Sequence, residues 1–535
     1  MKFTGTRSNC AVDSAFAIAS GLAADGGLFV PQEFPVFTAE EFAAMVDMDY
    51  CQRAAAVLEK YLTDYTADEI KYCVEGAYKG TFDNDYPAPV VDIADNRRML
   101  ELWHGPTCAF KDLALQLLPY LLTTALKKTS TGREAVILVA TSGDTGKAAL
   151  AGFADVKDTR IIVFYPRDGV SDMQKLQMTT QQGGNVTVCA IAGNFDDAQN
   201  GVKAIFTDDE MKKFLLDNNM EFSSANSINF GRLVPQVVYY VSAYCDMLKD
   251  GSLKSGEEFN VVVPTGNFGN ILAAVYAKKM GVPVKKFICA SNKNNVLTDF
   301  IRTGVYDRNR PFHTTESPSM DILISSNLER LLHMLSDGNC ELVAKLMAEL
   351  KTAGKYEIPA DMLEKLQKEF YGTWCDDAAG GAEIAEIFKA QNYLCDTHTA
   401  VAVAAGKAYR KESGDETLQL IASTASAYKF APAVLAALTD EALADDDFEK
   451  LETLSKITGT PVPAPFPPRL PISKAMRFCI KSASIKKIWQ NSSKANWCKH
   501  GEKTLAALLH LCQNSGTGAG GRLGNAPCYR RDIRQ

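Results

Sequence analysis

The sequence has few of the features that mark metalloproteins and disulfide-rich proteins. Its 535 residues include 14 cysteines and 6 histidines, but no two cysteines have the C-x-x-C spacing. No cysteine combines with a histidine at the spacing of a metal site either. The cysteines are therefore typical of a reduced, cytoplasmic protein, and we expect no bound metal.

Long apolar runs and an excess of positive charge are also missing. No apolar stretch reaches the roughly eighteen residues of a membrane-spanning helix. The formal net charge is -7, whereas a nucleic-acid-binding protein presents a basic surface. Residues 1–30 contain Asp13 and Asp25 and lack a long apolar segment, which fits neither a secretory signal nor a transit peptide. We expect a cytoplasmic protein that binds neither nucleic acid nor membranes.

The pattern of apolar residues changes near residue 96. Before it, apolar residues recur at helical spacing, which predicts a mainly helical region over 1–95 with helices at 39–46, 52–62 and 67–78. After it, apolar strands alternate with helices, which predicts a mostly parallel α/β sheet covered on both faces over 96–470. The expected strands are 134–140, 160–165, 185–191, 259–263, 286–290 and 418–422.

A single lysine stands between an apolar flank and the expected start of a helix. Lys111 follows Gly105-Pro106, which favours a turn, and precedes the apolar-rich stretch 112–118. If apolar surroundings hold its stem, the loss of hydration favours the uncharged amine. Such an amine is the nucleophile of a Schiff-base enzyme. On local context alone, an exposed lysine at a helix start is the alternative interpretation.

Two glycine-containing loops follow expected strands, at the edge where parallel sheets bind ligands. The loop 142–146 offers hydroxyls and amides at a helix start, which could hold a carboxylate or phosphate or merely cap the helix. The second loop could hold a phosphate against backbone amides and a helix N-terminus, or be only a tight turn. Its residues are Gly266, Asn267, Phe268, Gly269 and Asn270.

Together, the lysine and the two loops resemble those of the threonine synthase family of fold-type II pyridoxal phosphate enzymes. The resemblance extends from about residue 2 to about residue 470. It implies a tryptophan synthase β-like fold with two open, mostly parallel sheets flanked by helices. It also implies pyridoxal phosphate as the cofactor. The segments that carry it are 21–31, 104–107 with 110–112, 140–146, 224–229 with Arg232, 326–332, 396–400 and 423–430.

The resemblance further implies a role for each site residue. Lys111 would bind the cofactor covalently and then move protons on the substrate. Residues 266–270 would hold the cofactor phosphate, while Thr424 would bond the pyridine nitrogen and Asp144 would face the 3-oxygen. The substrate's carboxylate and phosphate would be bound by Ser142, Thr145, Asn226, Ser227 and Arg232.

The reaction implied by the resemblance converts O-phospho-L-homoserine and water to L-threonine and phosphate. A phospho-lyase that releases a 2-oxo acid and ammonia would need the same cofactor and anion-binding groups. A non-catalytic homologue that acts as a binding protein is a third interpretation, although Lys111, both loops and Thr424 are all present. We expect a monomer or a homodimer.

Two parts of the chain depart from the family pattern. Ser426 stands where the family usually has histidine, which affects the expected substrate contacts. Residues 471–535 are basic, with Glu502 and Asp532 as their only acidic residues, and we expect a largely disordered tail. Either a divergent extension or a shifted reading frame would explain it. The stretch Gly516–Gly521 fits G-x-G-x-x-G, but without a preceding strand we do not interpret it as a dinucleotide site.

Overall fold

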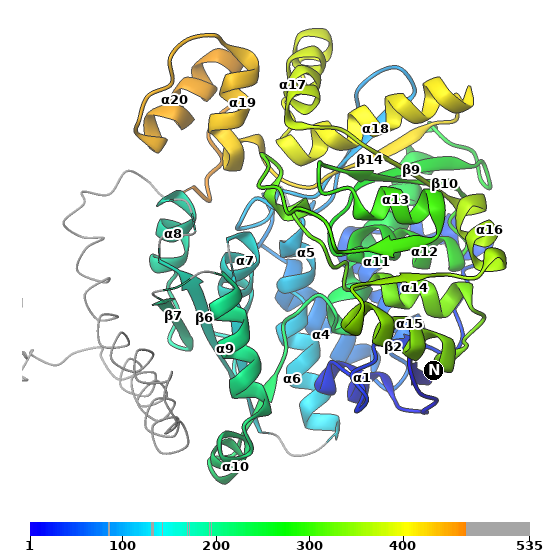
Figure 1. Ribbon diagram of the computed structural model, residues 1–535, viewed down its shortest axis with the longest axis vertical. Helices are drawn as coiled ribbons and strands as arrows, with labels where there is room; N and C mark the ends of the chain where they lie inside the picture. The colour runs from blue at the N-terminus through cyan, green and yellow to red at the C-terminus, as the bar shows by residue number, and fades with distance from the viewer. Residues whose placement is uncertain are drawn as a thin grey trace, which may run out of the picture.

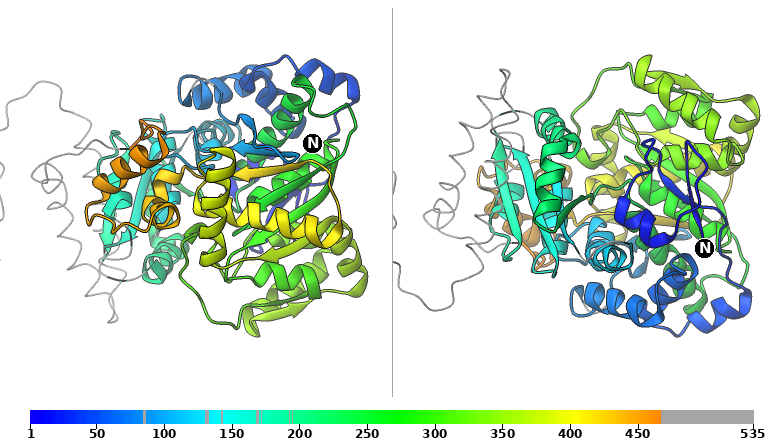
Figure 2. Two further views of the ribbon diagram at one scale, coloured as in Figure 1. Left: turned by 90° about the horizontal axis from the view of Figure 1, so that it is seen from above. Right: turned by 90° about the horizontal axis from the view of Figure 1, so that it is seen from below.

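The computed structural model contains two parallel-type sheets that lie side by side (Figures 1 and 2). It describes residues 1–83, 86–129, 133–141, 143–167, 170, 172–191, 193 and 195–466. The tail predicted for 471–535 and the candidate residue Ser142 lie outside this part of the chain. Among the described helices, none is both long and apolar enough to cross a membrane.

The larger sheet has the strand order β13-β10-β9-β14-β4-β3. Its neighbouring strands are parallel except for β3 and β4, which pair antiparallel at one edge. Successive side chains of the central strand β9 enter opposite cores, as the two-residue repeat of a strand requires: Val261 and Val263 join one and Val262 the other. The strands are β3 (Val90–Asp92), β4 (Arg97–Glu101), β9 (Phe259–Pro264), β10 (Val284–Ser291), β13 (Phe370–Trp374) and β14 (Gln419–Ser423).

Helices cover both faces of the larger sheet. The core that holds Val263 includes α11 (Phe230–Lys249) and α12 (Gly269–Lys279). The core that holds Val262 includes α17 (Asp377–Gln391), α18 (Thr397–Ser413), α19 (Ala431–Leu438) and α20 (Asp447–Thr458). Peripheral elements are α13 (Val296–Thr303), α14 (Leu328–Leu335), α15 (Cys340–Thr352), α16 (Ala360–Glu369), and the short strands β11 (Val305–Asp307) and β12 (Lys355–Glu357).

The smaller sheet has four parallel strands in the order β7-β6-β5-β8. They are β5 (Glu134–Ala140), β6 (Thr159–Pro166), β7 (Val186–Ile191) and β8 (Met220–Ser223). The accompanying helices are α5 (Lys111–Leu115), α6 (Leu118–Thr129), α7 (Asp144–Phe153), α8 (Asp172–Thr179), α9 (Phe195–Thr207) and α10 (Asp209–Asp217). Two open, mostly parallel sheets flanked by helices confirm the predicted fold class. The six expected strands are present, whereas the short strands β3, β4, β8 and β13 were not predicted.

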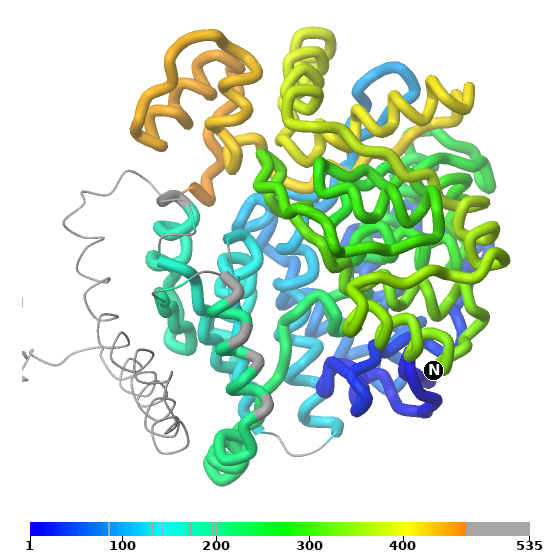
Figure 3. The backbone as a smooth tube through the Cα atoms, viewed as in Figure 1, coloured from blue at the N-terminus to red at the C-terminus, as the bar shows by residue number. Residues whose placement is uncertain are grey.

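The amino-terminal region contains the three predicted helices. They are α2 (Ala39–Met45), α3 (Tyr50–Tyr61) and α4 (Ala67–Tyr78), and each begins with a capping box, in which side chains satisfy free amides of the first turn. The region also has α1 (Ser14–Ser20) and the antiparallel pair of β1 (Phe3–Gly5) and β2 (Phe29–Pro31). The trace in Figure 3 shows the darkest blue segments, next to the amino terminus, below the yellow-green α14 and α15. The domain boundaries at 95/96 and 470/471 stay predictions.

Arg53 connects the amino-terminal region to helix α11 through a buried ion pair and hydrogen bonds. It lies on α3 and is 1% exposed. Its guanidinium donates to the carboxylate of Asp246 on α11 over 2.6 Å and to the hydroxyl of Ser242 over 2.9 Å. Two more bonds go to the carbonyls of Met45 and Val46. A buried charge satisfied in this way cannot lose its partner without a large cost.

We therefore expect Arg53→Leu to lower the free energy of unfolding by about 3 kcal/mol, because Asp246 loses its cationic partner Arg53 in a poorly solvated position. Urea unfolding followed by tryptophan fluorescence measures this change. The matched control is Lys2→Ala, which breaks an ion pair with Asp13 whose side chains are 51% and 53% exposed. It should cost less than about 1 kcal/mol. Equal losses in the two variants would contradict the assignment.

Candidate active site

The predicted site residues gather where strands of both sheets end. Lys111 follows β4, Thr424 follows β14, and the loop 266–270 follows β9. From the smaller sheet, Asp144 follows β5 and Arg232 follows β8. Within each sheet these strands are parallel to their neighbours, except where β4 pairs with β3. The carboxyl ends of the strands therefore lie at one edge of each sheet. Helix α5, which begins with Lys111, packs between α7 and α11 (Figure 1).

The loop before Lys111 is held by the next residue, Asp112. The buried Asp112 carboxylate accepts bonds from the Thr107 amide over 2.8 Å and from the Thr107 hydroxyl over 2.7 Å. Gly105 must be glycine here, because a Cβ atom would lie 2.6 Å from the Asp112 side chain. Burial raises the pKa of Asp112 to about 6, although both bonds from Thr107 oppose the shift. The Gly-Pro turn and this carboxylate therefore fix the direction in which the Lys111 side chain projects from the backbone.

The segment before Lys111 also pairs with the segment after β14. The Phe110 amide donates to the Thr424 carbonyl over 2.9 Å, and the Ser426 amide donates to the Cys108 carbonyl over 3.0 Å. This pairing brings Thr424 beside Lys111. Ser426, at the usual histidine position, is buried and its hydroxyl accepts from the Tyr428 amide at the start of a short 3₁₀ helix.

The amine of Lys111 has the environment that a nucleophile needs. Its Nζ atom donates to the hydroxyl of Ser319 over 3.2 Å. Burial is the largest influence and lowers the pKa of Lys111 below its ordinary value. The nearby carboxylate of Asp144 opposes this shift, and the positive charge of Lys429 adds to it. The net direction favours the uncharged amine.

The glycine loop 266–270 lies directly against the segment that contacts Lys111. A Cβ atom on Gly266 would lie 2.5 Å from the carbonyl oxygen of Ser319, so no larger residue fits. Phe268 adopts a left-handed conformation with φ 63°, and α12 begins at the next residue. Asn270, in the first turn, accepts a bond from Tyr240 at 2.5 Å, but its buried Nδ2 has no hydrogen-bond partner among the residues that the structure describes. Free amides and an unpaired amide donor at a helix start suit an anion.

Arg232 is a second buried donor, and no ion pair with an acidic residue is found for it in the described part of the chain. It lies in the first turn of α11 and is 4% exposed. One guanidinium nitrogen donates to the Ala225 carbonyl over 2.5 Å, while the buried Nε has no hydrogen-bond partner within that part. Burial lowers the pKa of Arg232 to about 10, which still leaves it charged at neutral pH. A buried cation with an unused donor is a receptor for an anion.

Asp144 forms a buried ion pair across the two halves of the site. Its carboxylate, on α7 of the smaller sheet, lies 3.1 Å from the Nζ of Lys429, which follows β14 of the larger sheet. Burial alone would raise the pKa of Asp144, but the charges of Lys429 and Lys111 outweigh it and lower the pKa to about 2. Lys429 also donates to the Thr107 carbonyl over 2.8 Å, so this pair braces the loop before Lys111.

The other predicted substrate residues are more open. Thr145 and Ser227 are partly buried, and Asn226 is exposed on the loop between β8 and α11. The Asn226 carboxamide accepts from the Ser227 hydroxyl over 3.3 Å. Their roles, like that of Ser142 outside the described residues, stay predictions. In the described part of the chain, no group of three or more His, Cys, Asp or Glu side chains is arranged to hold a metal ion.

Several site residues were not identified by the sequence analysis. Ser319 contacts Lys111, and Lys429 pairs with Asp144. The fully buried Arg330 binds the carbonyls of Phe29 and Ile228. It also binds the side chain of Asn327, whose amides in turn bind the Asn267 carbonyl of the glycine loop. Arg330 and Lys429 lie in segments recognised as family-like, but nothing in the local pattern indicated their partners.

Comparison with known families agrees with this arrangement. Residues 2–78 match the family described as threonine synthase N terminus, and residues 399–461 match threonine synthase, C-terminal. Residues 100–423, which include Lys111, both loops and Arg232, match the family of pyridoxal-phosphate dependent enzymes.

The chain belongs to the threonine synthase family. The threonine synthase of Pseudomonas aeruginosa is 39% identical over 436 residues, which are 81% of this chain and 90% of that protein. The human protein called threonine synthase-like 1 is 42% identical over 456 residues, or 83% of this chain. The chain spans only 60% of the length of that relative.

Solved structures of threonine synthases have the same fold. The pyridoxal phosphate-bound enzyme from Brucella melitensis superposes with a TM-score of 0.77 and 37% identity, covering 86% of this chain and 94% of that one. The yeast enzyme also gives 0.77, with 33% identity over 90% of this chain and 99% of that one. Pyridoxal phosphate is thus the cofactor of this threonine synthase family member. The residues present fit it, since Lys111 offers a desolvated amine and Asn270 an unpaired buried donor at the glycine loop.

We expect pyridoxal phosphate to attach covalently to Lys111 of the cofactor-free chain at neutral pH, because burial keeps more of this amine uncharged. Attachment should rise with pH and reach half its maximum below about 10.4, the ordinary lysine pKa. Borohydride reduction and peptide mass spectrometry measure it.

Lys111→Ala should abolish this attachment, whereas Lys127→Ala, at an exposed position near the end of α6, should leave it unchanged. A half-maximum at the ordinary lysine value would show that the amine is not desolvated.

Proposed function

We propose that this protein is a threonine synthase that converts O-phospho-L-homoserine and water to L-threonine and phosphate. The observation that carries the proposal is a pair of unused buried donors at the site of one amine. Asn270 Nδ2 and Arg232 Nε both lack hydrogen-bond partners among the described residues, and the charge of Arg232 lowers the pKa of Lys111. A phosphorylated cofactor and a phosphorylated substrate need two such positions.

The donors suit the two anions differently. The glycine loop offers backbone amides, an amide side chain and the N-terminus of α12, which together suit the cofactor phosphate. Arg232 offers a fixed, charged fork, which suits the phosphate or carboxylate of the substrate. In our proposal the open residues Thr145, Asn226 and Ser227, together with Ser142, complete the substrate site.

When bound, pyridoxal phosphate supplies an electron sink that stabilises negative charge at the substrate's α carbon. Lys111 takes the α proton and moves protons at the β and γ carbons. A β proton is also removed, and the bond between the γ carbon and the ester oxygen of the phosphate breaks. The γ carbon gains a proton, water adds its hydroxyl at the β carbon, and the α carbon regains a proton. Phosphate leaves toward Arg232, which balances its charge.

The remaining residues set the protonation states around this chemistry. Asp144 stays ionised because Lys429 faces it, and in our proposal it lies near the 3-oxygen of the cofactor. The Thr424 hydroxyl would bond the pyridine nitrogen. A hydroxyl leaves that nitrogen largely uncharged, whereas a carboxylate at the same position would favour its protonation.

Product analysis tests the proposed reaction. With O-phospho-L-homoserine, we expect equal amounts of L-threonine and phosphate, measured by amino-acid chromatography and a phosphate assay. A phospho-lyase on the same fold would instead give 2-oxobutanoate and ammonia with the phosphate, and a binding protein would release none. Either of these results would overturn the proposal.

A second test concerns the substrate's anionic group. Arg232→Leu should raise the KM for O-phospho-L-homoserine by about 10- to 100-fold, because one or two charge-assisted hydrogen bonds are lost. Arg232→Lys should give an intermediate KM, since it keeps the charge but not the planar fork.

Both variants should still take up pyridoxal phosphate at Lys111, which serves as the folding control. A KM unchanged in Arg232→Leu would remove this residue from the substrate site.

A further inference from the structure

A line of three hydrogen bonds leads away from Lys111 into the buried start of α18. The Lys111 amine donates to the Ser319 hydroxyl over 3.2 Å. The backbone amide of Ser319 donates to Nε2 of His398 over 3.1 Å. The other ring nitrogen, Nδ1, lies 2.7 Å from the carboxylate of Asp396. His398 and Asp396 are 3% and 0% exposed, so solvent does not compete for the bond between them.

The geometry fixes which nitrogen of His398 carries the proton. A backbone N–H can only donate, so Nε2 must present its lone pair to Ser319. The proton is then on Nδ1, and this N–H donates a hydrogen bond to the carboxylate of Asp396. Asp396 is itself immobilised as the N-cap of α18, because it also accepts from the amides of His398 and Thr399. The ring of Phe430 packs edge-on against the imidazole at 4.8 Å. The imidazole therefore has one orientation and one tautomer.

Ser319 is held equally well on its other sides. It lies in a single-turn 3₁₀ helix (Pro318–Met320), whose first amides have no partner within the helix. His398 satisfies one of them. The Ser319 carbonyl lies against Gly266, where a single Cβ atom would not fit. The backbone of Ser319 thus has little freedom to follow a moving lysine.

We propose that Asp396 and His398 are positioning residues that fix Ser319, and that Ser319 in turn orients the amine of Lys111. An uncharged lysine amine has two hydrogens and one lone pair. When one hydrogen is directed to Ser319, the lone pair keeps one defined direction, in which it can face the bound substrate. A lysine side chain has four rotatable bonds and would otherwise sample many directions. Correct placement of a reacting atom within about 1 Å is worth up to roughly 100-fold in rate.

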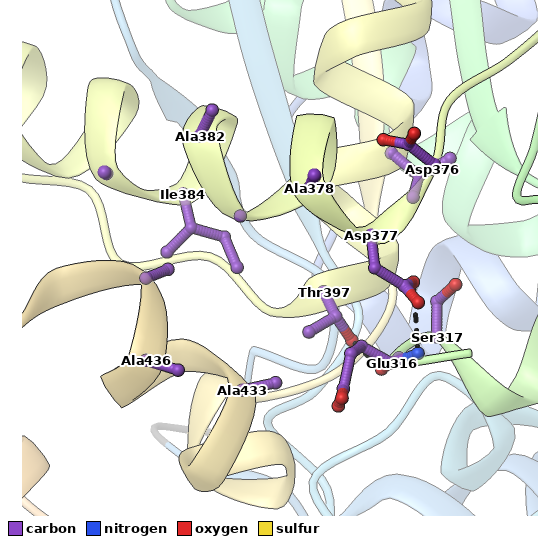
Figure 4. A pocket seen from close by; sticks show the side chains of 15 residues that line it. Glu316, Ser317, Asp376, Asp377, Ala378, Ala382, Ile384, Thr397, Ala433 and Ala436 are labelled. Atoms are coloured by element: carbon purple, nitrogen blue, oxygen red, sulfur yellow. Dashed lines mark hydrogen bonds between the residues drawn. The ribbon is translucent and has the colours of Figure 1, made fainter. Parts of the chain in front are cut away.

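The far side of this segment provides a matched control. Figure 4 shows a pocket of about 400 Å³ between α17, α18 and α19, with Glu316, Ser317 and Thr397 on its wall. There the Thr397 hydroxyl donates to the Glu316 carbonyl over 2.7 Å, and the Glu316 amide donates to Asp377 over 3.2 Å. The Thr397 hydroxyl thus connects the same segment to the same helix as His398 does, but through Glu316 instead of Ser319.

The inference rests on the proposed function only in that Lys111 is the reactive amine. It is tested first without substrate, by the rate at which pyridoxal phosphate attaches to Lys111 of the cofactor-free chain. Borohydride trapping and peptide mass spectrometry follow this rate. A wild-type chain that attached the cofactor but made 2-oxobutanoate would refute the proposed function and leave this measurement intact.

Two substitutions at position 398 separate the hydrogen bond from bulk packing. His398→Asn keeps a donor near Asp396 but no acceptor within reach of the Ser319 amide. We expect it to slow attachment by about 10-fold or more and to lower kcat with little change in KM. His398→Gln places an amide oxygen near the position of Nε2, and it should restore the rate to within about 3-fold of wild type. Failure of Gln to do better than Asn would overturn the proposal.

Two further variants guard against a folding defect and a general loosening of the segment. Ser319→Ala keeps the amide bond to His398 and removes only the hydroxyl, so it should slow attachment as much as His398→Asn does. Thr397→Val should leave the rate within about 2-fold of wild type, since it breaks only the tie to Glu316. A wild-type rate in Ser319→Ala, or an equal loss in Thr397→Val, would show that this line of bonds does not position Lys111.

Discussion

The site depends on lowering the pKa of a lysine amine beside a carboxylate that would raise it. Asp144 is close enough to raise the pKa of Lys111, and a lysine held as an ammonium would be no nucleophile. Lys429 opposes this effect, because it pairs with Asp144 at 3.1 Å and its own charge lowers the pKa of Lys111 together with burial. The same cation keeps Asp144 ionised at the pH of the cell. One buried ion pair thereby influences the pKa values of two groups, and the residues that form it follow strands of different sheets.

The sequence alone predicted those parts of the fold and site that follow from local patterns of residues. The strands at 134–140 and 259–263 could be predicted because long apolar runs have few alternatives in a parallel sheet. The rule that carboxyl ends of parallel strands share one edge placed the loop 266–270. The nearness of Lys111 to it came from the family resemblance, because β4 was not predicted, and the structure joins the two through Ser319. The helix starts were less accurate. The helix that was expected from residue 112 begins at Lys111, and the helices after the two loops begin at Asp144 and Gly269, inside the loop segments 142–146 and 266–270. The first turns therefore belong to the site itself.

The rest of the site could not be predicted, because it depends on contacts between distant segments. Ser319 and His398 are ordinary residues in their local sequence, and their bond joins a backbone amide to a ring nitrogen that no pattern specifies. The partners of Arg330 could not be predicted either. The two carbonyls that it binds come from β2 and from the loop after β8, which lie close together only in the folded chain. The short strands β8 and β13 were missed for a related reason: four or five residues carry too little periodicity, and pairing with β5 and β10 defines them.

Arg330 has a consequence for how the chain can be divided. Its guanidinium joins the Phe29 carbonyl of the amino-terminal region to Asn327, which closes the cofactor loop. Removing residues 1–95 would strand a fully buried cation next to that loop and expose the apolar surface beneath it. The amino-terminal segment is therefore not a separable domain. A fusion protein that contained only the catalytic part would need another segment to bury this arginine and accept its hydrogen bonds.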